Sequence, residues 1–239
     1  MNVAIDLGNT LAKVGIFEHQ QLTEKFFLKD LSEVHELLKN FSGGRVIISS
    51  VNSNSSELLE SEIQFSDKIV LSHRTPLPVT IRYSTPETLG VDRIAAVCGA
   101  RAEFPGRNCL VIDAGTCITY ELLDEQGSYW GGGISPGMAM RFKAMNAFTS
   151  RLPLVEPAED VALIGKSTIA SMQSGVIHGI IDEIDGVIER YRQKFENLQV
   201  ILTGGDCRFF ENKLKASIFA SPELVLKGLN SILLHNIRD

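Results

Sequence analysis

Two apolar runs that each end in Asp-x-Gly are the features that most constrain the fold of this chain. Residues 1–10 read MNVAIDLGNT, and residues 109–116 read CLVIDAGT. Each run predicts a buried strand that ends in a carboxylate, followed by a tight turn whose backbone N–H groups can face a phosphate. Two such turns, roughly a hundred residues apart, indicate two similar halves that hold one phosphorylated ligand.

The composition narrows the class of protein. The chain has 239 residues, of which 44% are hydrophobic and 22% charged, as in globular proteins with an apolar core. Its net charge of −6 argues against a nucleic-acid partner, because phosphate backbones attract clustered Lys and Arg. Long apolar runs and a leader-like segment are both missing, so we expect a cytoplasmic protein with no membrane partner. The cysteines lack CxxC spacing, which predicts reduced, buried thiols at Cys98, Cys109, Cys117 and Cys207.

The order of apolar segments predicts an α/β protein with two related mixed-sheet domains. The first half holds a predicted strand hairpin, a helix and a further strand, and ends in a helix that begins at Thr85-Pro86. The second half repeats strands and helices and contains a long amphipathic helix capped by Ser167. Strands are expected at 3–5, 12–17, 45–51 and 109–113, and helices at 31–41, 57–63, 85–103, 136–146 and 168–195.

The first Asp-x-Gly turn carries several groups suited to a phosphate. Gly8 lets the backbone approach an anion, Asn9 and Thr10 add side-chain donors, and Lys13 adds positive charge. Asp6 would repel a phosphate directly, so it suits a metal ligand. A simple hairpin turn in which Asp6 and Asn9 satisfy backbone groups explains the motif equally well.

Three further segments have unusual composition. Thr203-Gly204-Gly205-Asp206 follows a predicted strand, and a glycine-rich loop is expected at 131–137, where either close backbone approach or a flexible connection explains the glycines. Gly90-Val91-Asp92-Arg93 is expected on the helix at 85–103. Its charged pair on an otherwise apolar helix indicates a patch that faces a cleft, or an exposed pair on the solvent face.

The ordered set of short motifs resembles one known family. DLGNT, GVDR, DAGT, GGGISPG, IGKST and TGGD occur in the order and spacing found in type III pantothenate kinases, which belong to the superfamily of acetate kinase, sugar kinases, Hsp70 and actin. The resemblance covers essentially the whole chain. It implies two RNase H-like (actin-like ATPase) domains with mixed sheets, at residues 1–106 and 107–239, with a ligand cleft between them.

The resemblance also implies which residues bind ATP and cations. The second ATP contact would be Thr116, and Asp113 would bind a monovalent cation, K⁺ or NH₄⁺. Mg²⁺ would lie near Asp6. In one respect the chain departs from the family, because Glu121 stands where the family often has Asp. The first ATP-phosphate loop would comprise Asp6, Leu7, Gly8, Asn9, Thr10, Leu11, Ala12 and Lys13.

The same resemblance implies the acceptor site. Pantothenate would bind to Gly90, Val91, Asp92 and Arg93, with Asp92 as the catalytic base and Tyr83 as a further contact. Thr168 matches a substrate contact that reaches in from a neighbouring subunit, so a homodimer is implied. The implied reaction is ATP-dependent phosphorylation of pantothenate to 4′-phosphopantothenate, the first step of coenzyme A biosynthesis.

Two alternatives remain open at this level. One is a different phosphotransferase of the same fold, such as an acetate kinase, a sugar kinase or an exopolyphosphatase; these lack GVDR at this place. The other is a catalytically weak, nucleotide-binding regulatory homologue. The carboxylate of Asp92 favours an enzyme, because a protein that only binds nucleotide has no need of an acceptor base.

Overall fold

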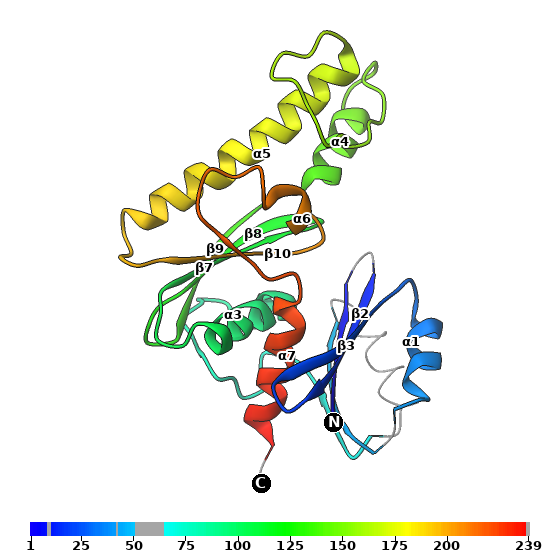
Figure 1. The fold of residues 1–239 in the computed structure, drawn as a ribbon, viewed down its shortest axis with the longest axis vertical. Coiled ribbons are helices and arrows are strands. Elements are labelled where there is room, and N and C mark those ends of the chain that lie inside the picture. Colours follow the sequence, from blue (N-terminus) through cyan, green and yellow to red (C-terminus); the bar gives the residue numbers. More distant parts are fainter. Residues whose placement is uncertain (9–10, 42, 51–64, 238–239) are drawn as a thin grey trace. The chain divides into compact units, whose positions relative to one another are not determined.

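A computed structural model describes residues 1–8, 11–41, 43–50 and 65–237 (Figure 1). The chain forms two compact units. The first comprises Met1–Gly106, Leu123–Gly131 and Glu223–Asp239, and the second comprises Arg107–Leu122 and Gly132–Pro222. Helices and two mixed sheets confirm the expected α/β class.

The first unit is built on a five-stranded sheet in the order β3-β2-β1-β4-β5. Antiparallel pairing joins β1 to β2 and β2 to β3, whereas β1 is parallel to β4 and β4 to β5. Every residue of β1 is buried, as expected for an apolar strand between two neighbours. The bounds are β1 Asn2–Leu7, β2 Ala12–Glu18, β3 Gln21–Leu28, β4 Arg45–Ser50 and β5 Asp67–Val70.

Among its described residues, this unit has three α-helices. Asp30 caps α1, because its side chain accepts a hydrogen bond from the backbone N–H of Glu33 at 3.0 Å. The backbones of α3 and α7 lie in close contact, since a Cβ at Gly228 would overlap the carbonyl oxygen of Ala95 (Figure 1). The bounds are α1 Leu31–Leu38, α3 Val91–Glu103, α7 Leu224–Asn236, the 3₁₀ helix η1 Pro86–Thr88 and the short strand β6 Thr80–Ile81.

The second sheet has the order β11-β10-β7-β8-β9-β6. Strand β10 pairs in parallel with β7 and with β11. The longest helix, α5, lies along this sheet (Figure 1). The bounds are β7 Cys109–Ala114, β8 Cys117–Leu123, β9 Ser128–Pro136, β10 Gln199–Thr203, β11 Phe219–Ala220, α4 Met138–Ala147, α5 Thr168–Arg192 and α6 Cys207–Phe210.

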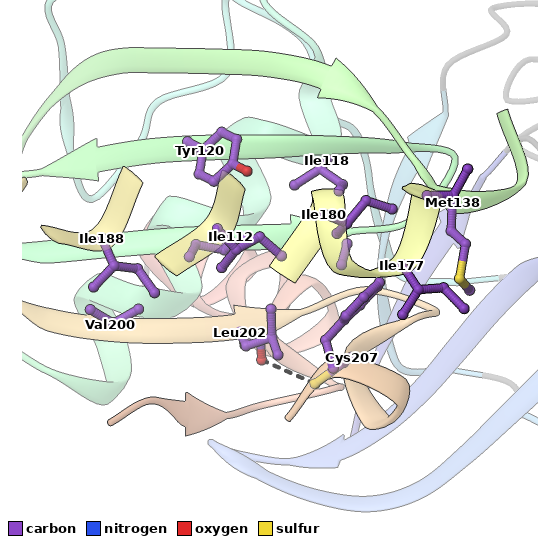
Figure 2. Close-up of a cluster of buried hydrophobic side chains, with 14 of the residues drawn as sticks. Ile112, Ile118, Tyr120, Met138, Ile177, Ile180, Ile188, Val200, Leu202 and Cys207 are labelled. Carbon is purple, nitrogen blue, oxygen red and sulfur yellow. Dashed lines mark hydrogen bonds between the residues drawn. The ribbon is translucent and has the colours of Figure 1, made fainter. Parts of the chain in front are cut away.

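The core of the second unit lies between α5 and the sheet (Figure 2). Apolar residues of α5 recur at helical spacing, and each fully buried Ile contributes about 1.5–3 kcal/mol relative to exposure. The Cys207 thiol donates a hydrogen bond to the Leu202 carbonyl at 3.3 Å. The residues that pack together include Ile112, Ile118, Ile177, Ile180, Ile184, Ile188, Val200 and Leu202.

Two sequence predictions of secondary structure are wrong. The helix expected at 85–103 is interrupted, because Leu89 and Gly90 are extended and α3 begins only at Val91. Gly90, a residue type that disfavours helix interiors, is the N-cap of α3, and the Leu89 side chain before it is buried. The glycine-rich loop expected at 131–137 is a strand as far as Pro136, and Gly132 lies so close to the Tyr120 carbonyl that a Cβ would overlap it.

Other expectations have mixed outcomes. All four cysteines are free thiols, as predicted; three are buried, and Cys117 is half-buried. The helix expected at 57–63 lies outside the described residues. In the part of the chain that the structure describes, no helix is long and apolar enough to span a bilayer.

Candidate active site

The β1–β2 hairpin places an acidic side chain, Asp6, beside a basic one, Lys13. Asp6 is the register partner of Lys13, so both side chains lie on the same face of the sheet. Asp6 is only 7% exposed. Its burial raises its pKa from 3.8 to about 6, against the attraction of Lys13 and with added repulsion from Asp92, while a hydrogen bond with Ser49 lowers it. The first unit therefore brings Asp6, Lys13 and Asp92 into electrostatic contact.

The turn between these strands is closed by its backbone. The Gly8 N–H donates to the Leu11 carbonyl at 3.2 Å, and both residues are exposed. Leu7 and Ala12, at the two strand ends, are buried. The candidate donors Asn9 and Thr10 lie outside the described residues.

Gly90–Arg93 forms the start of α3 rather than its middle. Gly90 is the N-cap residue, and Val91 and Asp92 occupy the first turn. The Asp92 carboxylate accepts a hydrogen bond from the Arg93 N–H at 2.9 Å. Unpaired N–H groups give this end of a helix a partial positive charge, which stabilises a carboxylate. Asp92 therefore lies at the positive end of the α3 dipole.

An aromatic stack fixes Tyr83 next to Arg93. The Tyr83 and Tyr129 rings are stacked, with centroids 6.3 Å apart and planes 10° apart. The Arg93 guanidinium carbon lies 5.6 Å from the centroid of the Tyr83 ring, a cation–π arrangement. Tyr129 was not identified as a candidate from the sequence. The first unit thus joins Tyr83 to the Gly90–Arg93 segment.

The second Asp-x-Gly turn lies in the second unit at the end of β7. Asp113 is half-buried and Thr116 is exposed. The Gly115 N–H donates to the Cys117 carbonyl at 3.0 Å, which closes the turn. Asp113 is in register with Thr203 of β10, and among the described residues the buried Thr203 Oγ1 has no hydrogen-bond partner. The TGGD motif indicated this strand end, but sequence reasoning did not assign Thr203 a role.

The remaining candidate residues of the second unit, Thr168 and Glu121, lie on different elements, α5 and β8. Thr168 is the first residue of α5 and is exposed. Ser167 caps this helix by accepting a hydrogen bond from the Ala170 N–H at 3.2 Å. Glu121 is fully buried in β8, and its charge adds to burial in raising the pKa of Tyr191 on α5.

Metal binding at either turn would depend on few protein side chains. Within the ranges that the structure describes, no group of three or more His, Cys, Asp or Glu side chains could hold an ion. Mg²⁺ is commonly bound by one or two carboxylates together with substrate phosphates and water. Asp6 at the strand end fits that mode, whereas a closed metal cage does not fit these residues.

Comparison with known proteins identifies close relatives. A family model described as type III pantothenate kinase matches residues 2–190. The type III pantothenate kinase of Phocaeicola vulgatus is 46% identical over 239 residues, covering 99% of each chain. That of Christiangramia forsetii is 47% identical over 240 residues, again covering 99% of each chain.

Solved structures share the fold at lower identity. A Campylobacter jejuni protein described as a conserved member of the Baf family of transcriptional activators has a TM-score of 0.67 and 23% identity, covering 98% of each chain. A Sinorhizobium meliloti protein described as a 2-dehydro-3-deoxygalactonokinase has a TM-score of 0.62 and 14% identity, covering 97% of this chain and 98% of that one. These two similarities concern the fold alone.

Proposed function

Because this chain belongs to the type III pantothenate kinase family, we propose that it transfers the γ-phosphoryl group of ATP to the primary hydroxyl of pantothenate. The products are 4′-phosphopantothenate and ADP, and the reaction is the first step of coenzyme A biosynthesis. The observation that supports this most is the Asp92 carboxylate at the start of α3, beside the Tyr83–Arg93 pair.

Asp92 is the proposed catalytic base. Phosphoryl transfer has a loose transition state, so the hydroxyl proton leaves late and a carboxylate suffices to accept it. The Arg93 N–H keeps the Asp92 oxygen in place, and its guanidinium supplies positive charge for the pantothenate carboxylate. Tyr83, Gly90 and Val91 complete the proposed pantothenate site.

The proposed ATP site consists of Asp6–Lys13 and Thr116. Lys13 and the backbone N–H groups of the turns neutralise and orient the phosphates. Asp6 would hold Mg²⁺ and Asp113 would hold K⁺ or NH₄⁺; when bound, these ions offset negative charge on the phosphates. The buried Thr203 Oγ1, in register with Asp113, is an oxygen donor suited to a hard cation.

The proposal includes a cytoplasmic homodimer. Large apolar side chains close to Thr168 in sequence are exposed to solvent: Leu163 is 75%, Ile164 76% and Ile169 51% exposed. Exposed apolar groups of this size are typical of protein interfaces. A second copy that covers them would let Thr168 reach the neighbouring pantothenate site.

An ADP-release assay with Mg²⁺ and K⁺ tests the function. We expect ADP release with pantothenate but not with acetate or sugars. Asp92→Asn should lower kcat by about 10²–10⁴-fold, the usual contribution of a general base. Glu87→Gln, an exposed acid on η1, is the matched control and should keep full activity. Nucleotide binding without pantothenate-dependent ADP release would instead support the regulatory homologue.

A further inference from the structure

The proposed ATP contact at Thr116 rests on two other segments of the second unit. The Gly137 N–H donates to the Thr116 carbonyl at 3.1 Å, and a Cβ at Gly137 would overlap the Gly115 carbonyl oxygen. The Asp206 N–H donates to the Ala114 carbonyl at 2.8 Å. The position of this turn therefore depends on the backbone at Gly137 and at Asp206.

The backbone that precedes Gly137 is held by one side chain of α4. Arg141 Nε donates to the Pro136 carbonyl at 2.8 Å, and its Nη2 donates to the Ser135 hydroxyl at 2.9 Å. The planar guanidinium presents these donors in a fixed geometry, which an ammonium group does not. Arg141 therefore fixes both residues before Gly137.

Glu183 of α5 anchors Arg141 in turn. It forms an ion pair with Arg141 Nη2 and accepts a hydrogen bond from the Tyr120 hydroxyl at 2.8 Å. The two charged side chains are only 21% and 28% exposed, so water screens the pair less than a surface pair. Burial pushes the pKa of Glu183 upward, but hydrogen bonds with Arg141, Ser135 and Tyr120 outweigh it and hold the pKa below its usual range.

The helix that carries Glu183 is a rigid support. Ile180 and Ile184, on either side of Glu183 in α5, are fully buried in the core of the second unit. Residues 141 and 183 are 42 positions apart in sequence, so the pair joins two distant segments. The ion pair thus connects the packed core to the backbone that supports Thr116.

We propose that Arg141 and Glu183 are positioning residues for the ATP-binding turn at Asp113–Thr116. The pair ties Ser135–Gly137 to α5, and Gly137 in turn fixes the carbonyls of Gly115 and Thr116. This inference rests on the proposed function, in which Thr116 contacts ATP. The Arg141–Glu183 pair should therefore affect the binding of ATP rather than the binding of pantothenate.

Steady-state kinetics and titration with a fluorescent ATP analogue test this role. Arg141→Met should raise the KM for ATP and the Kd of the analogue roughly tenfold, the order expected when one charge-assisted hydrogen bond is lost. The KM for pantothenate should change by less than about twofold, because the acceptor site keeps its contacts. Arg141→Lys keeps the positive charge but lacks the planar set of guanidinium donors, so we expect an intermediate loss of ATP affinity.

Coupling between the two residues provides a second readout. Glu183→Gln should weaken ATP binding, and adding it to Arg141→Met should cost little more, since both changes break the same link. Lys213→Met is the matched control: it removes the ion pair to Glu159, 3.2 Å long and in the same unit, and should leave ATP affinity unchanged. If Arg141→Met does not fold, Arg141→Lys and Glu183→Gln carry the test.

The possible outcomes separate this inference from the proposed function. Variants with a lower melting temperature but the wild-type Kd for the ATP analogue would overturn the positioning role. If the wild-type protein does not phosphorylate pantothenate but the variants bind the ATP analogue more weakly than the wild type does, the proposed function is overturned and the positioning role stands.

Discussion

Replacing the buried Asp6 by Asn should stabilise the protein while removing its activity. Burial raises the pKa of Asp6 from 3.8 to about 6, so the folded state favours the protonated carboxyl. The stability that this preference supplies is fully present below pH 3.8 and is lost as the pH rises through about 6. Asn is neutral at every pH, and its amide oxygen can still accept the hydrogen bond from Ser49.

The size of the effect follows from the two pKa values. The difference between 3.8 and about 6 corresponds to about 3 kcal/mol, because one pKa unit is worth about 1.4 kcal/mol. Above pH 7, Asp6→Asn should therefore raise the free energy of unfolding by up to about 3 kcal/mol. In a chain of this length that gain raises the melting temperature by roughly 6–12 °C. Kinase activity should fall, because Asn does not supply the anionic ligand proposed for Mg²⁺.

Thermal unfolding without nucleotide, at pH 4 and pH 8, measures this difference. Asp92→Asn is an informative second variant. It removes the repulsion that Asp92 exerts on Asp6, but also the favourable charge at the start of α3, so the gain at pH 8 should be smaller. A variant no more stable than the wild type at pH 8, or equally stabilised at both pH values, would refute the reasoning.

Three further outcomes are expected. Ile180→Ala should lower the free energy of unfolding in urea by about 2–5 kcal/mol, and a loss below about 1 kcal/mol would contradict its place in the core. Tyr129→Leu should raise the KM for pantothenate severalfold, since an aromatic pair is worth about 0.5–1.5 kcal/mol, with the KM for ATP unchanged; equal changes in both would count against the stack with Tyr83. Ile164→Asp should convert dimers to monomers in sedimentation experiments, and both Ile164→Asp and Thr168→Ala should lower activity. An unchanged sedimentation coefficient of the Ile164→Asp variant would argue against this interface.

The sequence predicted those elements whose signals are local. The apolar runs on either side of the LGNT turn were sufficient to predict the first hairpin. The start of α5 was predicted because Ser167 is a strong N-cap residue before an apolar pattern of helical period. In both cases the deciding residues lie within a few positions of each other.

Features that depend on distant contacts were not predictable. Thr85-Pro86 and the apolar residues after Arg93 suit one continuous helix, yet the backbone at the buried Leu89 is extended and α3 begins only at Val91. Glycine has low strand propensity, so the glycine-rich sequence did not indicate that the strand continues beyond Gly132 as far as Pro136.

The same limit applies to the candidate site. Its carboxylates could be predicted, because Asp6 and Asp113 stand at the ends of apolar runs and Asp92 belongs to the GVDR motif. Tyr129 and the Arg141–Glu183 pair, by contrast, contribute through partners far away in sequence, and no local pattern marks them.

The packing of α7 against α3 also has a consequence for synthesis of the chain on the ribosome. The first unit contains the strands β1 to β5, yet it is completed by Glu223–Asp239, which are made after the whole of the second unit. A nascent chain that has released β1 and α3 still lacks the helix that packs against α3. Domains usually fold in order of synthesis, but here the unit that begins first must finish last, after the second unit has emerged in full.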